Sequence, residues 1–102
     1  MNQYNIEYSK EARQDLIEIK RYIKYNLQEP ATAQKLISKI KTEIDKLKSD
    51  PQIYAIIDDD FIKKFEIRKL IVDNYIVFYR IQNNNIQIVR IMYGRRNWIN
   101  LL

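Results

Sequence analysis

Hydrophobic and polar residues alternate over residues 3–8, and the pattern then changes to helical spacing. The alternation predicts a short strand whose apolar face carries Tyr4, Ile6 and Tyr8. Ser9 stands where a helix N-cap is expected. Apolar residues then recur at spacings of three and four, which predicts an amphipathic helix running to about Gln28.

A second helical pattern begins at Pro30, a residue that is favoured in the first turn of a helix. It keeps an apolar stripe until Pro51, which ends it. Because the link between the two helices is short, we expect them to form an antiparallel hairpin. The surface charges of both helices are mixed in sign, which indicates a solvated scaffold.

The pattern changes once more after the acidic segment 58–60, where β-branched and aromatic residues dominate. Strands joined by tight turns are predicted over 61–72 (as one strand or as two broken pieces), 75–81 and 86–93. The N-terminal strand must join this sheet, because it could not be stable alone. The predicted architecture is an α+β fold of order β-α-α-β-β-β, with the helix hairpin on one face of an antiparallel sheet and the other face free.

Composition narrows the class of protein. A chain of 102 residues with 46% hydrophobic residues can bury one core, so we expect a single domain over residues 1–102. Neither cysteine nor histidine occurs, which argues against a disulfide framework and the usual zinc sites and removes the commonest general base. We expect no cofactor and no metal. No leader peptide or membrane-spanning run is recognisable, so we expect a cytoplasmic protein with no membrane partner.

Positive charge is concentrated in the C-terminal part of the chain. The net charge is +5, and residues 61–102 contain 8 Lys+Arg against 2 Asp+Glu. Five of these cations are arginines, whose planar fork suits phosphate and carboxylate groups. Ordinary surface charge and an anion-binding face both remain possible readings.

Gly94 is the only glycine of the chain and stands between a predicted strand and a pair of arginines, Arg95 and Arg96. Glycine adopts positive φ angles at little cost, so we expect a sharp turn that aims both arginines from the end of the sheet. A plain strand end or a bulge is the alternative.

Three segments together resemble the RelE/ParE superfamily, the small toxins of bacterial type II toxin–antitoxin modules. They are YSKEARQDLIEIKRYI, RKLIVDNYIVFYRI and IVRIMYGRRNWINLL. The resemblance runs from Tyr4 to Leu102 and implies a compact fold of the predicted kind. It also implies a cognate, usually acidic antitoxin in a toxin–antitoxin hetero-oligomer. The implied target is either messenger RNA in the ribosomal A site, which is cleaved, or DNA gyrase, which is inhibited.

The resemblance also assigns candidate residues. The family's arginine after the glycine matches Arg96, and the position before the glycine is Tyr93. Basic residues before the central hairpin match Lys64 and Arg68, with Glu66 between them.

Two positions depart from the pattern of the RNA-cleaving branch. Ile76 stands where that branch usually has an arginine. After Gly94 the only aromatic residue is Trp98, whereas that branch often ends with a catalytic tyrosine.

RNA cleavage by attack of a 2′-hydroxyl needs a base, an acid and stabilisation of a negatively charged phosphorane. Without histidine, the base would be Glu66, or Tyr93 with its pKa lowered by arginines. We predict a catalytic set of Arg68, Arg96, Tyr93 and Glu66, and target-binding cations Lys64, Arg95, Arg80 and Arg90. Structural alternatives stay open: Tyr93 half-buried at a strand end, and Glu66 paired with Arg68 or a lysine.

These observations predict the toxin of a type II toxin–antitoxin module that cleaves ribosome-bound mRNA, a possible ribosome-dependent endoribonuclease. One alternative is a ParE-like toxin that inhibits gyrase without cleaving RNA. Another is a non-catalytic nucleic-acid-binding module, although the basic excess is modest and no reading helix is recognisable.

Overall fold

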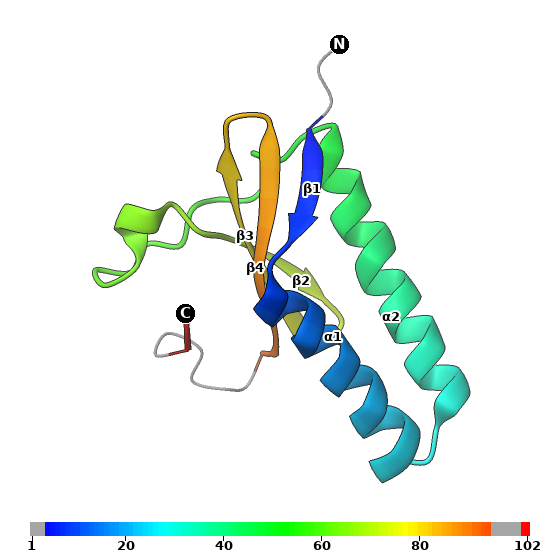
Figure 1. The fold of residues 1–102 in the computed structure, drawn as a ribbon. Helices are drawn as coiled ribbons and strands as arrows, with labels where there is room; N and C mark the ends of the chain where they lie inside the picture. The colour runs from blue at the N-terminus through cyan, green and yellow to red at the C-terminus, as the bar shows by residue number, and fades with distance from the viewer. Residues whose placement is uncertain (1–3, 95–100) are drawn as a thin grey trace.

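The computed structural model describes residues 4–94 and 101–102, and its elements follow the predicted order (Figure 1). The N-terminal half consists of β1 (Asn5–Tyr8), α1 (Lys10–Arg21), the π-helical turn η1 (Tyr22–Asn26), α2 (Pro30–Asp45) and the 3-10 turn η2 (Lys46–Lys48). The C-terminal half consists of the 3-10 turn η3 (Lys63–Phe65), β2 (Arg68–Val72), β3 (Tyr75–Gln82) and β4 (Asn85–Tyr93).

The first helix begins where the sequence predicts and changes its winding before it ends. The Ser9 hydroxyl accepts a hydrogen bond from the N–H of Ala12 at 2.9 Å, which satisfies one of the free donors at the helix N-terminus. After Arg21 the chain widens into η1, where the N–H of Leu27 reaches the carbonyl of Tyr22, five residues back. The prediction of one helix to Gln28 is therefore wrong in its last turn, because apolar spacing does not distinguish a single π-turn from an α-turn.

The four strands form one sheet in the order β1-β4-β3-β2. β2–β3 and β3–β4 are antiparallel hairpins with two-residue turns, in which Asp73 and Asn83 adopt left-handed backbone angles, φ 54° and 57°. β1 joins the sheet as predicted, but it pairs in parallel with β4, so the sheet is mixed. The parallel pairing follows from the helix hairpin, which lies between these two strands in the sequence.

Only the second half of the predicted strand 61–72 is a strand. The segment begins with η3, and Glu66 ends that turn in a left-handed conformation with φ 55°. The buried side chains of Ile62 and Ile67 anchor the turn, and β2 starts at Arg68. Neither reading of this segment, as one strand or as two broken pieces, is correct, because its first half forms a 3-10 turn and only its second half forms a strand.

The main core lies between the sheet and the two helices, which cover the same face (Figure 1). A second, smaller cluster lies on the opposite, outer face and consists of Ile67, Ile76, Phe78 and Met92, with Ile57, Val89 and Leu102 packed against it. The expectation that this outer face is free is therefore wrong for its apolar half. A loop residue and the last residue of the chain cover it.

Candidate functional site

The strand register shows on which face of the sheet each predicted arginine begins. Residues that pair directly across strands share a face. Arg90 pairs with Phe78 of the outer cluster, and Arg68 pairs with Tyr79 of the helix-side core. Arg80 follows Tyr79 along β3 and therefore points to the outer face. Three arginines that the sequence placed in one site thus leave the sheet on two faces.

Arg90 is engaged by a carboxylate of α1. Its Nε and Nη2 donate to the two oxygens of Asp15 at 2.8 and 2.9 Å. Asp15 also accepts the backbone N–H of Ile91 at 2.9 Å, so one carboxylate closes the edge of β4 beyond the end of β1. These hydrogen bonds raise the pKa of the Arg90 guanidinium. Its Nη1 donates to the carbonyl of Leu101 at 3.2 Å, which ties the end of the chain to the same pair.

Arg68 stabilises the loop that follows α2. Its Nη1 donates to the carbonyl oxygen of Tyr54. The neighbouring Tyr79 hydroxyl donates to the carbonyl of Pro51 at 2.7 Å. Burial raises the pKa of Tyr79 to about 12, although the charge of Arg68 acts in the opposite direction. Arg68 therefore supports the loop on the helix side of the sheet.

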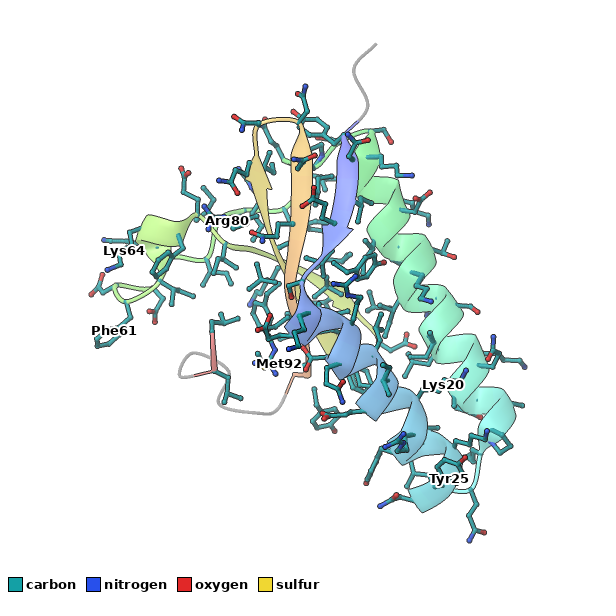
Figure 2. The ribbon with its side chains drawn as sticks, in the orientation of Figure 1. Lys20, Tyr25, Phe61, Lys64, Arg80 and Met92 are labelled. Atoms are coloured by element: carbon teal, nitrogen blue, oxygen red, sulfur yellow. The ribbon has the colours of Figure 1, made fainter. Side chains whose placement is uncertain are left out.

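Arg80 differs from the other two strand arginines, because no carboxylate or carbonyl group in the described part of the chain engages its guanidinium. Its Nε atom is buried and lacks a hydrogen bond within the described part of the chain. The side chain is half-buried on the outer face, and Figure 2 shows it on the side of the molecule away from α2. Of the strand arginines, Arg80 is the one whose charge remains available to a ligand.

Lys64 and Glu66 lie in and directly after the η3 turn, at the far side of the molecule from α2 (Figure 2). The Lys64 ammonium lies 5.3 Å from the centre of the Phe65 ring. Glu66 is exposed, and within residues 4–94 and 101–102 it forms no salt bridge with Arg68 or with a lysine. Because Glu66 belongs to a left-handed turn and not to β2, the strand alternation does not set its direction.

Tyr93 ends β4, and its ring packs edge-on against Tyr75 with centroids 5.6 Å apart. Gly94 follows, and its N–H donates to the carbonyl of Asn74 at 2.8 Å. The φ angle of Gly94 is not positive, so the expectation of a left-handed turn is wrong. Glycine fits here for a different reason: a Cβ atom would lie 3.3 Å from the Asn74 oxygen. Arg95 and Arg96 lie outside the described residues.

A cleft of about 820 Å³ opens between the two helices and the end of the sheet. Its lining is largely apolar and aromatic, with residues such as Ile19, Tyr22, Leu36, Tyr75 and Tyr93. Acidic and basic groups lie at its border, where Lys39 forms a 2.6 Å salt bridge with Asp73. The sequence reading missed this cleft, because its lining comes from the helices, the β2–β3 turn and the end of β4. Only the folded chain brings these segments together.

The whole chain, and not one motif, decides the family. A family model described as the ParE toxin of the type II toxin–antitoxin system parDE matches residues 6–98. The chain belongs to the ParE toxin family. The predicted resemblance to the RelE/ParE superfamily is thereby confirmed, and its ParE branch is the one that matches.

Solved structures share the fold of this ParE-family chain. A chain of the chromosomal ParDE TA system from P. aeruginosa has 20% identity and a TM-score of 0.74, over 89% of this chain and 96% of that one. A chain of the toxin–antitoxin complex RelBE2 from Mycobacterium tuberculosis has 16% identity and a TM-score of 0.62, over 91% and 93%. At these identities the likeness concerns the fold alone. No curated protein matches the sequence.

Among the described residues of this ParE-family toxin, the predicted strand arginines do not gather in one place. Arg68 lies on the helix side, Arg80 lies on the outer face, and Arg90 is engaged by Asp15. The sequence reading missed Asp15, because it is one of three acidic residues of α1 and its neighbours in the sequence do not show that it alone is buried. The described residues contain no group of three acidic side chains arranged to hold a metal ion. None of the helices in this part of the chain is long and apolar enough to cross a membrane.

Proposed function

We propose that this ParE-family toxin arrests growth by inhibiting DNA gyrase and is neutralised by a cognate acidic antitoxin. The observation that carries the proposal is that two of the residues that RNA cleavage would need, Glu66 and Arg68, stand in different surroundings. Glu66, the candidate base, stands in an exposed turn, whereas Arg68 lies on the helix side of the sheet beside Tyr79. A general base must come within about 3 Å of the proton that it removes, together with the groups that stabilise the developing charge.

Ile76 supports the same direction. It occupies the position where the RNA-cleaving branch usually carries an arginine, and its side chain is buried in the outer apolar cluster. A phosphorane at this place would meet methyl groups where it needs a cation. The family model adds to this, because it describes the ParE toxin.

An acidic antitoxin fits the charge of the chain, which is +5. The two similar structures come from toxin–antitoxin systems, so a hetero-oligomer with an antitoxin is the expected state of this chain. We propose Arg80, together with Arg95 and Arg96, as the cations that meet the target or the antitoxin. The supporting observation is that no carboxylate among the described residues forms a salt bridge with Arg80.

Controlled expression without antitoxin tests the proposal. Growth should stop with a DNA-damage response and gyrase-linked breaks, while transcripts remain intact. The Arg80→Gln variant should need at least tenfold more inducer than the parent to stop growth. The Glu66→Gln variant should stop growth at the same inducer concentration as the parent. The matched control is Lys46→Gln, because Lys46 is an exposed cation on the scaffold. If transcripts are cleaved early and the Glu66→Gln variant loses its activity, the target is ribosome-bound mRNA and not gyrase.

A further inference from the structure

Charges on α1 are segregated onto opposite flanks, although the sequence appears mixed. The acidic residues Glu11, Asp15 and Glu18 follow one another at spacings of four and three. All three act on Arg90: Asp15 binds it directly, and the other two contribute through their charge. This acidic flank therefore faces β4 and the cleft.

The cations of the same helix lie on the other flank. Lys10, Arg13 and Lys20 fall at spacings of three or four residues around Ile17, which places them along one side of α1. Lys24 follows in the η1 turn. Arg13 and Ile17 line a groove with Lys41 of α2, away from the acidic flank. Arg21 lies next to this row. We call these five cations, Lys10, Arg13, Lys20, Arg21 and Lys24, the α1 basic stripe.

The described residues supply no salt-bridge partner to the five cations, although Glu7 lines the same groove as Arg13. Each of their residues is exposed, and within the described residues none forms a salt bridge. Lys24 lies 5.2 Å from the centre of the Tyr25 ring, a contact that leaves its charge intact. Figure 2 shows Lys20 and Tyr25 toward the helix hairpin tip, far from Arg80 and Lys64. The stripe is thus a second basic surface, separate from the outer face of the sheet.

We propose that the α1 basic stripe binds the phosphate backbone of duplex DNA. From Lys10 to Lys24 the helix rises about 20 Å, so the cations can follow a regular row of charges. DNA presents one negative charge per about 1.7 Å of helix axis, and its major groove is wide enough to admit an α-helix. The stripe exposes one large apolar residue, Ile17, at its centre. An acidic protein segment would need a broader apolar contact area than this.

This inference goes beyond inhibition of gyrase, because the stripe could bind DNA whether or not the toxin acts on that enzyme. Its measurement is equilibrium binding of the purified full chain to a fluorescein-labelled 20-base-pair duplex over a range of salt concentrations. Growth arrest is scored separately, so a failure of either proposal can be recognised on its own.

The stripe variant is Arg13→Gln/Lys20→Gln/Lys24→Gln, and the matched control is Lys35→Gln/Lys46→Gln/Lys48→Gln, which removes the same charge from α2 and η2. Glutamine keeps the helix propensity of lysine and arginine, so both variants should keep the parent's circular dichroism, although the control also removes two surface salt bridges, Lys46–Glu43 and Lys48–Asp45. We expect the slope of log affinity against log salt to fall by about 2.7 in the stripe variant, which is 0.9 for each lost phosphate contact. The control should change it by less than about one third of that amount.

Three outcomes would overturn the proposal. An equal fall of the salt slope in the stripe variant and in the control would mean that DNA binding depends only on net charge. If Arg95→Gln/Arg96→Gln weakens DNA binding and the stripe variant does not, the DNA-binding residues lie at the C-terminus. If the stripe variant loses binding of poly-glutamate but not binding of DNA, the ligand of the stripe is an acidic peptide.

Discussion

Asp15→Asn should weaken the fold more than its single-atom change suggests. The carboxylate is 9% exposed and its partner Arg90 is 23% exposed. It accepts three hydrogen bonds, two from Arg90 and one from the N–H of Ile91. Asparagine has one acceptor oxygen and no charge, so it can keep the Ile91 bond while the guanidinium loses its counter-charge.

The magnitude follows from this geometry. Removing one partner of a buried ion pair costs about 3–5 kcal/mol, because the remaining charge stays desolvated. Water reaches part of the Arg90 side chain, so we expect a loss of about 2–4 kcal/mol in the free energy of unfolding. A domain of this size has a total of about 5–15 kcal/mol, so the variant should be clearly less stable and still folded.

Urea denaturation followed by circular dichroism measures the change. With a slope of about 1–2 kcal/mol/M, the midpoint should fall by about 2 M while the slope stays the same. Glu18→Gln is the matched control, since Glu18 is an exposed acid on the same flank, and it should cost less than about 0.5 kcal/mol. If Asp15→Asn costs less than about 1 kcal/mol, the pair does not hold α1 against β4. The double variant with Arg90→Gln should recover part of the loss, because it removes the stranded charge.

Three further substitutions test separate features. Tyr79→Phe should remove the last step of the spectrophotometric tyrosine titration, because burial raises the pKa of Tyr79 to about 12. The neutral Tyr79 phenol contributes its full stabilisation below about pH 10, and this contribution is lost as the pH rises through about 12, because the phenol ionises first in the unfolded chain. Titration of every tyrosine near pH 10 would contradict this. Gly94→Ala should change the free energy of unfolding by less than about 1 kcal/mol, because φ is not positive and the Asn74 oxygen needs only a small shift; a loss above about 2 kcal/mol would indicate a strained turn after all. Asp73→Asn should lower the pKa of Lys39, which the Asp73 hydrogen bond raises, and an unchanged value in an NMR titration would refute the pairing.

Local signals in the sequence were sufficient for the order of the elements. The Ser9 cap, the run of β-branched and aromatic residues in β3 and the two-residue turns each depend on neighbours within a few positions, so they can be read without the fold. The parallel pairing of β1 with β4 and the end of α1 in a π-turn depend on contacts between distant segments, and the sequence pattern could not contain them.

The positions of the candidate site residues depend on contacts that a local pattern does not contain. Alternation gives the face of a residue only while the strand is regular. A bulge between Phe78 and Tyr79 shifts the register with β4, and the left-handed turn at Glu66 ends the alternation before β2. The engagement of Arg90 by Asp15 joins residues 75 positions apart, which no local pattern reports. Arg80 is the predicted strand cation that the fold leaves without a partner.

The most direct test of gyrase inhibition is a supercoiling assay with purified gyrase, relaxed plasmid, ATP and increasing amounts of this chain. Supercoiling should be blocked, the block should be removed by the cognate antitoxin, and translated mRNA incubated with the same preparation should remain intact. Unimpaired supercoiling in the presence of excess toxin, together with cuts in ribosome-bound mRNA, would contradict gyrase as the target.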